Sequence, residues 1–231
     1  MPEKIRLSVV MPTLNEEVCV AKVIEDIRTF AAGTDLEIVI VDSSTDRTAE
    51  IAESMGVRVL RQERQGPGKA VIAGLQASKG DAVMMADCDD TYPMEDIPKF
   101  LGWWKEGYDF VNGNRINSLH DAMPKLNRFG NWMFAFLVRV LYCIPTWDVA
   151  SGMRLYSRRL IDSEPWETNL AFWIEIIVKA KKKGFKFKEI PITYRPRIGE
   201  TTLNAWRSSR AFLLCILKYR FGLGFIPNDL L

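Results

Sequence analysis

Val83-Met84-Met85-Ala86-Asp87-Cys88-Asp89-Asp90-Thr91-Tyr92-Pro93 is the stretch around which the chain is organised. An apolar run that stops at a polar cluster is typical of a buried strand that delivers side chains to a sheet edge. If the backbone stays extended there, the carboxylates of Asp87 and Asp89 point the same way. Such a pair favours Mg2+ or Mn2+, which take oxygen ligands and substrate phosphates. The alternative is an acidic turn that caps the next helix.

Three shorter apolar runs precede this stretch, and each is followed by a predicted helix. The runs are Ile5 to Met11, Leu36 to Val41 and Val57 to Leu60. The helices are expected from a cap at Thr13 or Asn15 to Phe30, from Thr45 or Asp46 through Met55, and from Ala70 to Ser78. This alternation predicts a parallel sheet covered by helices, with ligands bound at the carboxyl ends of the strands.

Three of these strand ends carry polar residues, namely Pro12 to Glu17, Asp42 to Asp46 and Asp87 to Asp90. Their convergence at one edge indicates a ligand site more strongly than any single motif. Asp42 is placed to accept hydrogen bonds from a base or a sugar hydroxyl, although a turn-forming role is the alternative. The loop ending in Gly66-Pro67-Gly68-Lys69 offers amides and an ammonium to a phosphate, or is a plain turn.

The composition fits one domain of moderate size, with or without an appendage, because the chain has 231 residues. A net charge of +2 argues against nucleic acid as a partner. The cysteines lack metal-like spacing, which favours free thiols in a reducing compartment; they are Cys19, Cys88, Cys143 and Cys215. The N-terminus lacks the layout of a signal peptide, and no run reaches the roughly 18 apolar residues of a membrane-spanning helix.

The motifs in this order and spacing resemble family 2 glycosyltransferases of the GT-A fold, over about residues 5 to 202. They are Pro12-x-x-Asn15-Glu16, Val41-Asp42-x-Ser44-x-Asp46-x-Thr48, the Gly-x-Gly-Lys loop ending at Lys69, Gly80-Asp81 and Asp87-x-Asp89. Within the family the chain is similar to the polyprenyl- (dolichyl-) phosphate sugar synthases. The segments that support this are Gly113-Asn114-Arg115, Met123 to Asn131, Asp148 to Arg154 and Arg197 to Thr201.

The resemblance implies an α/β fold with a mostly parallel twisted sheet and helices on both faces. It implies a catalytic domain over residues 1–202 and an amphipathic C-terminal helix over 203–231. The implied reaction is a metal-dependent, inverting transfer of mannose, glucose or N-acetylglucosamine to polyprenyl (dolichyl) phosphate. The donor would be GDP-mannose, UDP-glucose or UDP-N-acetylglucosamine. The expected location is peripheral, on the cytoplasmic face of a membrane.

The resemblance also assigns roles to residues. The donor-binding residues would be Pro12, Asn15, Glu16, Asp42, Lys69 and Asp87. Asp87 and Asp89 would bind the Mg2+ or Mn2+ that bridges the diphosphate, with Thr91 at a third ligand position where relatives often carry a stronger ligand. The predicted catalytic residues are Asp89 and three acceptor-side arginines, Arg115, Arg154 and Arg197. A guanidinium can clamp a phosphate with two hydrogen bonds; the alternative for Arg115 is a surface arginine.

The second half of the chain leaves more alternatives open. Phe129 to Ile144 is either a core helix or an amphipathic helix against a membrane or lipid tail. Glu175, in an apolar helix start, is expected to pair with an arginine or to face the site, and Lys179 to Lys183 to be a solvated helix end. Ile190 to Arg195 is predicted as an edge strand. Leu203 to Phe225 is basic and aromatic, which favours a membrane-surface helix over one docked on the core.

Two other functions remain compatible with the sequence. A same-fold transferase can use a soluble acceptor, such as a phosphorylated small acid, or a growing polysaccharide. A non-catalytic membrane-surface scaffold on a decayed transferase fold is the alternative of another class, although the intact Asp42, Lys69 and Asp87-x-Asp89 argue against decay. The lone His120 has no predicted role, and a phosphate acceptor is already ionised, so the reaction needs no strong general base.

Overall fold

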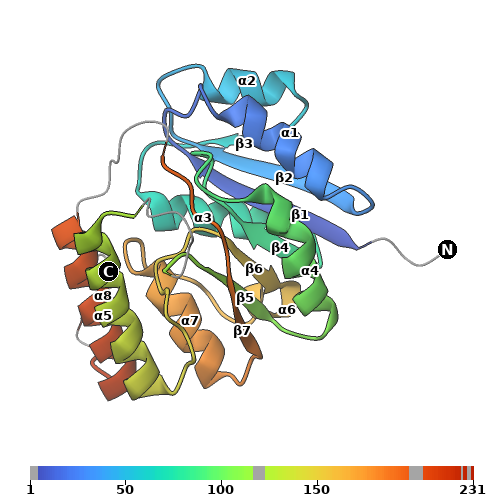
Figure 1. Cartoon of the computed structure of the whole chain (residues 1–231). Helices are drawn as coiled ribbons and strands as arrows, with labels where there is room; N and C mark the ends of the chain where they lie inside the picture. Colours follow the sequence, from blue (N-terminus) through green and yellow to red (C-terminus); the bar gives the residue numbers. More distant parts are fainter. Residues whose placement is uncertain (1–4, 117–122, 198–204, 225, 228–229) are drawn as a thin grey trace.

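A seven-stranded mixed sheet forms the centre of the protein (Figure 1). The computed structural model describes residues 5–116, 123–197, 205–224, 226–227 and 230–231. The strands are β1 (Arg6–Thr13), β2 (Asp35–Asp42), β3 (Arg58–Arg61), β4 (Ala82–Met85), β5 (Phe110–Asn114), β6 (Arg154–Ser157) and β7 (Phe187–Pro191). Their order across the sheet is β3-β2-β1-β4-β6-β5-β7, and only β6 runs antiparallel to its two neighbours.

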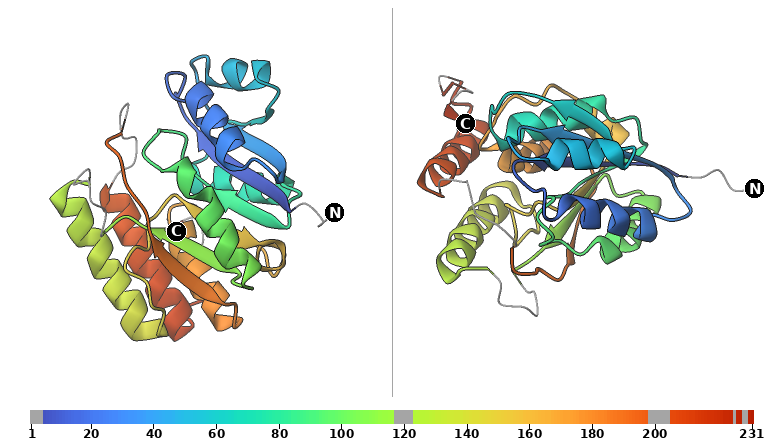
Figure 2. Two further views of the ribbon diagram at one scale, coloured as in Figure 1. Left: turned by 45° about the vertical axis from the view of Figure 1, so that its right-hand side comes forward. Right: turned by 90° about the horizontal axis from the view of Figure 1, so that it is seen from above.

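Helices cover both faces of this sheet, as the sequence predicts. They are α1 (Val20–Phe30), α2 (Thr48–Ser54), α3 (Pro67–Ala77), the 3-10 turn η1 (Met94–Asp96), α4 (Ile97–Lys105), α5 (Lys125–Tyr142), α6 (Arg158–Ile161), α7 (Phe172–Lys182) and α8 (Ala205–Phe221). Seen from above in Figure 2, α1 and α4 lie on one side of the sheet and α3 on the other. Helices α5 and α8 lie side by side at the edge of the molecule (Figures 1 and 2).

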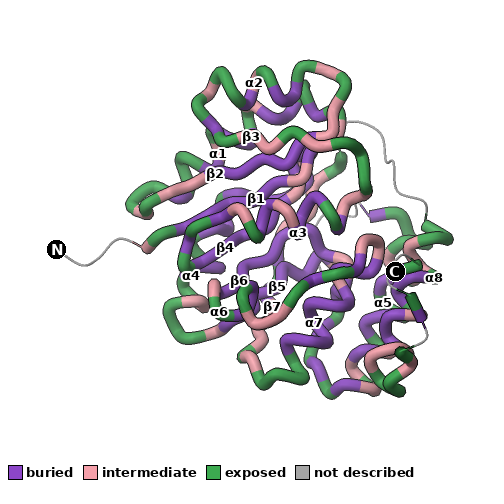
Figure 3. The backbone as a smooth tube through the Cα atoms, turned by 180° about the vertical axis from the view of Figure 1, so that it is seen from behind, coloured by how far each residue is buried: buried purple, intermediate pink, exposed green. Residues whose placement is uncertain are grey.

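Alternate residues of the central strands feed two separate hydrophobic cores, as the period of two in a strand requires. In β1, Val10 belongs to the core under α3, α5, α7 and α8, while Val9 and Met11 belong to the core under α1 and α4. In β4, Val83 and Met84 divide in the same way. Figure 3 shows most of β1, β2 and β4 as buried. Both faces are therefore covered, which leaves the strand ends as the accessible part of the sheet.

The strands and helices of the first half occur where they are predicted, but several boundaries differ. Helix α1 begins at Val20, and neither Thr13 nor Asn15 caps it, because Thr13 binds the last residue of β2 and Asn15 binds the loop that follows β2. Helix α3 begins at Pro67, so the predicted glycine loop is largely its first turn. Strand β4 ends at Met85, two residues before Asp87, so the extended backbone expected through the acidic stretch is not present.

Three expectations for the second half need correction. Glu175 pairs with Lys179 rather than with an arginine, at 2.7 Å. Lys179 is accordingly buried instead of solvated, since a buried carboxylate requires a partner. The edge strand is present as β7, but it is displaced towards the N-terminus and ends at Pro191.

Helix α8 docks on the core. Helix α5 contributes one face to the core and exposes the other. The inner face of α8 packs against α5 and α7 through Ala211, Phe212, Cys215 and Ile216. In the described part of the chain, no helix has the length and apolarity needed to cross a membrane. His120 and the Gly199-Glu200-Thr201 motif lie outside the described residues.

Candidate functional site

The loops that follow β1 and β2 bind each other and form one side of the site. The register of the parallel pair brings Thr13 opposite Asp42, and the Thr13 hydroxyl donates to the Asp42 carboxylate at 2.6 Å. Asn15 has a positive φ of 59°, and its side-chain oxygen accepts a hydrogen bond from the Thr45 backbone amide. The Glu16 amide donates to the Thr48 hydroxyl at 2.8 Å. These bonds hold two strand ends at a fixed spacing.

Asp42 is buried, and both of its carboxylate oxygens already accept hydrogen bonds from the protein. Besides Thr13, the hydroxyl and the amide of Ser44 donate to it, at 2.6 and 3.1 Å. Each oxygen has two lone pairs, so a ribose or base donor can be added to this set. Pro12 lies beyond the last residue pair between β1 and β4, where its missing N–H leaves no ladder bond unmade.

Three carboxylates and one guanidinium meet where β1 and β4 end. Arg197 donates to Glu16 at 2.9 Å and forms an ion pair with Asp89 at 3.2 Å. Asp87 belongs to the same cluster, because its charge acts on the ionisation of Glu16 and is itself affected by Asp89 and Arg197. The structure therefore brings together Glu16, Asp87, Asp89 and Arg197, which the sequence places up to 181 positions apart.

The cluster carries more negative charge than its arginines neutralise. Burial raises the pKa of the Glu16 carboxyl to about 7; Arg197 opposes this rise, and Asp89 and Asp87 add to it. Burial also raises the pKa of Asp87 to about 7, with Asp89 repulsion as the next cause and Arg115, Arg197 and Arg154 acting against it. Closely spaced buried carboxylates favour either protonation or an added cation. The cluster is suited to a divalent cation on this ground.

Gly152 lies directly against the Asp87 carboxylate. A Cβ added to Gly152 would lie 2.1 Å from Oδ2 of Asp87, so only a glycine leaves this carboxylate its place. The hard oxygen atoms of Asp87 and Asp89 match the preference of Mg2+ and Mn2+. Among the described residues, no group of three or more His, Cys, Asp and Glu side chains could hold a metal by itself. Oxygens of a substrate or water would have to complete the ligand set.

Thr91 is bound to Asp89. It is fully buried, and its hydroxyl donates to Oδ1 of Asp89 at 2.6 Å, while its amide donates to the same oxygen at 3.2 Å. These bonds fix the orientation of Asp89, and a role of Thr91 as a third ligand stays a prediction. Asp90 is not part of the cluster, since it binds Lys22 at 2.7 Å and faces Arg195.

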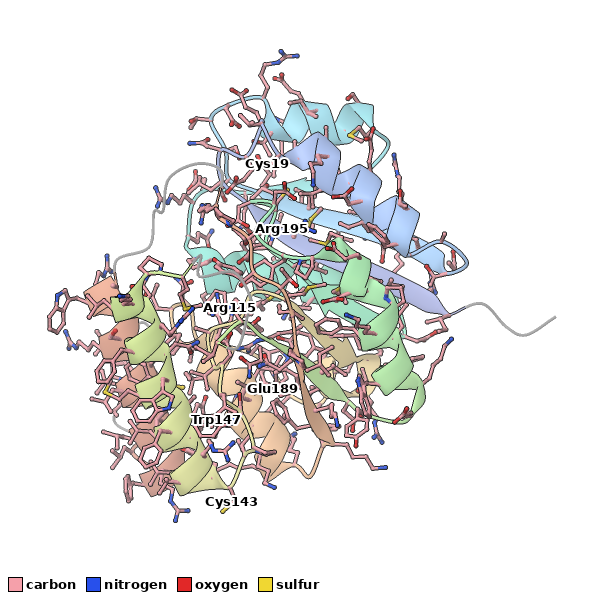
Figure 4. The ribbon with its side chains drawn as sticks, viewed as in Figure 1. Cys19, Arg115, Cys143, Trp147, Glu189 and Arg195 are labelled. Carbon is pink, nitrogen blue, oxygen red and sulfur yellow. The ribbon has the colours of Figure 1, made fainter. Side chains whose placement is uncertain are left out.

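The charge of Arg115 acts on Asp87 of this cluster, and its side chain is held in a buried frame of hydrogen bonds. Figure 4 shows Arg115 between Arg195 and Glu189. Its guanidinium binds Asp148 through Nε and a terminal nitrogen, at 2.8 and 2.9 Å. Its other terminal nitrogen donates to the Tyr92 hydroxyl at 3.0 Å, and the Gly152 amide donates to the same hydroxyl at 2.7 Å. Despite burial, the Arg115 charge lowers the pKa of Asp148 below its ordinary value. Tyr92 thus links Arg115 to the glycine beside Asp87.

Arg154 is placed differently from Arg115. Its side chain has no exposed surface, and its terminal nitrogens donate to the backbone carbonyls of Trp173 and Val149, at 3.0 and 2.6 Å. The guanidinium packs on the ring of Phe110, 5.5 Å from its centroid. Arg154 is thus bound within the core in this structure, and its contact with an acceptor phosphate stays a prediction. Its charge still acts on Asp87 from within the core.

Lys69 and the glycine loop are bound to a different partner from the one expected. The side-chain oxygen of Asn169 accepts hydrogen bonds from the amides of Gly68 and Lys69, at 3.1 and 3.3 Å. The Lys69 ammonium donates to the Glu167 carbonyl at 3.1 Å. The Asn169 side chain thus caps the start of α3, although it lies about a hundred positions later in the sequence. No contact within the described ranges joins Lys69 to the carboxylate cluster.

Helix α5 connects this frame to an exposed apolar surface. On its inner side, the Asn131 amide group donates to Asp148 at 2.7 Å and accepts from the Val149 amide at 3.1 Å. The rings of Phe129, Trp132 and Phe136 stack on one another on its outer side, with centroids 6.1 and 5.8 Å apart. The exposed large hydrophobic residues of α5 follow one helical stripe: Leu126, Phe129, Trp132, Met133, Phe136 and Val140. We call these six residues the α5 apolar stripe.

Sequence reasoning missed several residues of the site. Tyr92, Asn131, Asp148 as a partner of Arg115, and Glu189 form the frame, but they come from different elements and no local pattern marks them. The segments Met123 to Asn131 and Asp148 to Arg154 were the available signals for Asn131 and Asp148. The four cysteines form no disulfide, as expected.

Comparison with known sequences gives close matches. The family described as "Glycosyl transferase family 2" matches residues 8–163. "Dolichyl-phosphate hexose transferase" of Haloferax volcanii is 43% identical over 212 residues, which cover 92% of both chains. "Low-salt glycan biosynthesis hexosyltransferase Agl6" of the same organism is 37% identical over 94% of this chain and 55% of its own length.

Comparison with solved structures agrees on the fold. The complex of glucosyl-3-phosphoglycerate synthase from Mycobacterium tuberculosis with Mn2+, UDP and glucosyl-3-phosphoglycerate has a TM-score of 0.78 and 24% identity. The similarity covers 97% of this chain and 82% of that one. Mannosyl-3-phosphoglycerate synthase from Rubrobacter xylanophilus has a TM-score of 0.79 and 22% identity, over 96% and 76% of the two chains. At these identities the similarity concerns the fold alone.

Proposed function

The chain belongs to glycosyl transferase family 2, and from this premise we propose that it transfers a hexose from a nucleotide-sugar to polyprenyl (dolichyl) phosphate. One observation carries the proposal: Asn131 joins the frame of Arg115 to a helix whose outer face is the α5 apolar stripe. A phosphate site and an apolar surface on one element fit an acceptor that has a phosphate head and a lipid tail. The relative that matches 92% of this chain is named for a dolichyl-phosphate substrate.

The ends of β1, β2 and β4 form the donor side in this proposal. Asn15 and Asp42 would hold the base and ribose, with Pro12 shaping the same strand end, and Glu16 closes the cluster beside them. Asp87 and Asp89 would hold Mg2+ or Mn2+. Such an ion, when bound, neutralises charge that develops on the departing nucleoside diphosphate. Arg197 binds the carboxylates of Glu16 and Asp89, and a phosphate is the other partner that its guanidinium fits.

Arg115 would orient the acceptor. A guanidinium has five N–H donors, of which three are used by Asp148 and Tyr92 in the hydrogen bonds given above. The remaining two can bind a phosphate monoester. That phosphate is ionised at neutral pH and attacks the anomeric carbon through one of its oxygens, so no side chain has to remove a proton. Attack opposite the leaving diphosphate inverts the anomeric centre.

Attachment to the membrane would be peripheral. Helices α5 and α8 lie side by side, and α8 adds exposed Trp206, Leu213 and Phe221 to the α5 apolar stripe, together with exposed Arg207 and Arg210. Apolar side chains that enter the headgroup region and basic side chains that face anionic lipid are the features of an interfacial helix. The free cysteines fit the reducing, cytoplasmic side of the membrane.

A transfer assay with two acceptors tests this function. The protein would be incubated with Mn2+ and labelled UDP-glucose, GDP-mannose or UDP-N-acetylglucosamine, and with either polyprenyl phosphate in vesicles or 3-phosphoglycerate in solution. We expect label in the lipid phase with one of the donors. If label is transferred to 3-phosphoglycerate alone, the acceptor is a soluble molecule and not a lipid. Absence of both transfer and donor binding would favour a non-catalytic scaffold.

A further inference from the structure

Glu189, on the edge strand β7, is the most highly hydrogen-bonded carboxylate of the acceptor side. Asn114 and Asn112, from the neighbouring strand β5, donate to its two oxygens at 2.8 and 3.0 Å. Three donors from the loop that follows α5 bind the same carboxylate. They are the hydroxyl of Thr146 at 2.5 Å, the amide of Trp147 at 2.9 Å and the amide of Asp148 at 3.3 Å.

All five partners of Glu189 are hydrogen-bond donors, and this decides the chemistry that the position requires. An ionised carboxylate accepts at both oxygens, whereas an amide accepts at one and presents N–H groups at the other. Burial raises the pKa of Glu189 above its ordinary value, and the hydrogen bonds from Thr146, the Trp147 amide and Asn112 oppose this rise. A glutamine of the same size would place its NH2 group against several donors, and the hydrogen bonds at that position would be lost.

The loop that Glu189 holds carries the partner of Arg115. Asp148 has its amide bound by Glu189 and its carbonyl bound by Asn112, at 3.3 and 2.8 Å. Its carboxylate binds the side chain of Arg115 and also the Arg115 backbone amide, at 2.9 Å. The backbone position of Asp148 therefore sets the position of the guanidinium. In Figure 4, Glu189 and Trp147 lie below Arg115 in the same part of the molecule.

We propose that Glu189 is a positioning residue for the acceptor side, which fixes residues 146–148 so that Asp148 presents Arg115 to the acceptor phosphate. This inference rests on the proposed function. Glu189 does not touch the substrate; it acts through the loop and the ion pair. A displacement of about 1 Å at a group that orients a reactant can lower the rate by roughly a hundredfold. The exchange of the carboxylate for an amide would act in this way.

The chain offers a matched control at the opposite end of the same strands. Asp109 is buried just before β5, and its carboxylate accepts hydrogen bonds from the Lys186 amide and the Ser157 hydroxyl, at 3.0 and 2.9 Å. It thus joins the beginnings of β5 and β7 to the end of the antiparallel β6, as Glu189 joins β5 and β7 to a loop. Asp109→Asn removes a similar anchor away from Arg115.

The test compares Glu189→Gln with Asp109→Asn in steady-state transfer to polyprenyl phosphate and in calorimetric donor binding. We expect Glu189→Gln to lower kcat/KM for the acceptor by roughly 10- to 100-fold, with donor affinity within twofold of wild type. Asp109→Asn should retain the acceptor kinetics even if its melting temperature falls. Equal losses in the two variants, or acceptor kinetics of Glu189→Gln within twofold of wild type, would overturn the proposal.

A double-mutant cycle with Arg115→Lys separates positioning from general destabilisation. If Glu189 acts through Arg115, the double variant will be no slower than Arg115→Lys alone, because residues in one network do not add. If the loss of kcat/KM in the double variant equals the product of the losses in the two single variants, the inference is contradicted. Should Glu189→Gln fail to fold, Thr146→Val removes one donor and is expected to give a loss of about threefold with the same coupling. If Arg115→Lys itself leaves the acceptor kinetics unchanged, the acceptor role of Arg115 fails instead.

Discussion

The donor side and the acceptor side of this protein handle buried charge in opposite ways. On the donor side, Glu16, Asp87 and Asp89 face one another with Arg197 as their one direct ion-pair partner among the described residues. On the acceptor side, Asp148 binds Arg115 and Asn131, and Glu189 accepts hydrogen bonds from five residues. The first arrangement favours an additional cation. In the second, the carboxylates of Asp148 and Glu189 have their hydrogen-bond partners within the protein, and the guanidinium of Arg115 is held in place to bind an anion.

This difference separates residues that bind from residues that position. Unbalanced carboxylates with raised pKa values are suited to ligands that bring positive charge. A fully hydrogen-bonded network is rigid, and the loss of one member leaves the others unsatisfied. Substitutions on the donor side should therefore abolish metal and nucleotide binding, while those on the acceptor side should leave donor binding intact and affect the acceptor.

Asp89→Ala should have the largest effect. The substitution removes a carboxylate that would hold the cation. A bound cation stabilises the charge that develops on the leaving diphosphate by several kcal/mol. We expect transfer to fall by at least about a thousandfold. The adjacent Asp90→Asn is the control, because Asp90 binds Lys22 and Arg195 instead of the cluster. Equal losses in both variants, measured by transfer of labelled sugar, would remove the distinction between Asp89 and its neighbour.

Gly152→Ala should come next, since its Cβ would lie 2.1 Å from Oδ2 of Asp87 and would displace that carboxylate. We expect Mn2+-dependent donor affinity, measured by calorimetry, to fall by roughly 100-fold while the protein remains folded. Gly102→Ala, in α4, has no atom within 4 Å of its added Cβ. It should leave binding unchanged. Wild-type donor affinity in Gly152→Ala would show that donor binding does not depend on the position of the Asp87 carboxylate.

The pH dependence of metal binding follows from the carboxyl groups with raised pKa values. Burial raises the pKa of Glu16 and that of Asp87 to about 7, compared with about 4 in an unfolded chain. Their contribution to stability is complete below pH 4 and is lost as the pH rises through 7. A cation displaces these protons, so apparent affinity should fall about tenfold per pH unit per protonated carboxyl below 7.

Melting curves with and without Mn2+ at pH 6 and pH 8 measure this effect. The Mn2+-induced increase in melting temperature should be larger at pH 8. The same increase at both values would mean that the carboxylates are ionised throughout this range. Glu16→Gln should weaken the pH dependence, because it removes one of the two groups.

The α5 apolar stripe should give the smallest effect on chemistry and a clear effect on location. Replacement of Phe129, Trp132 and Phe136 by serine removes three exposed rings without opening the core. We expect co-sedimentation with anionic vesicles to fall severalfold, while donor binding stays unchanged. Phe30→Ser, an exposed ring at the end of α1, is the control. Unaltered sedimentation of the triple variant would mean that the stripe does not contact the membrane.

The sequence predicts the donor side better than the acceptor side, and the reason is the range of the interactions. Strands β1, β2 and β4 run parallel and end in polar residues, so a local pattern places Glu16, Asp42 and Asp89 at one edge. The acceptor side depends on β6, which runs antiparallel between β4 and β5 and is short. The burial of Arg154 depends on that pairing, and no local pattern shows it.

The residues that no local pattern revealed have partners far along the chain. Glu189 meets Asn112 across 77 positions and Thr146 across 43. Asn169 reaches Gly68 across 101 positions and takes the amides that were expected to bind phosphate. A motif indicates which groups can bind a ligand, but it cannot show that a distant side chain already occupies them.

Calorimetric titration of the nucleotide-sugars, with and without Mn2+, tests most directly whether the unbalanced carboxylates are the donor site. UDP-glucose, GDP-mannose and UDP-N-acetylglucosamine would each be added to the wild type, to Asp89→Ala and to Arg115→Lys. We predict that one donor binds, that its binding requires both Mn2+ and Asp89, and that Arg115→Lys binds it as the wild type does. Donor binding that is independent of Mn2+ and of Asp89, or is lost in Arg115→Lys, would contradict the division between the two sides.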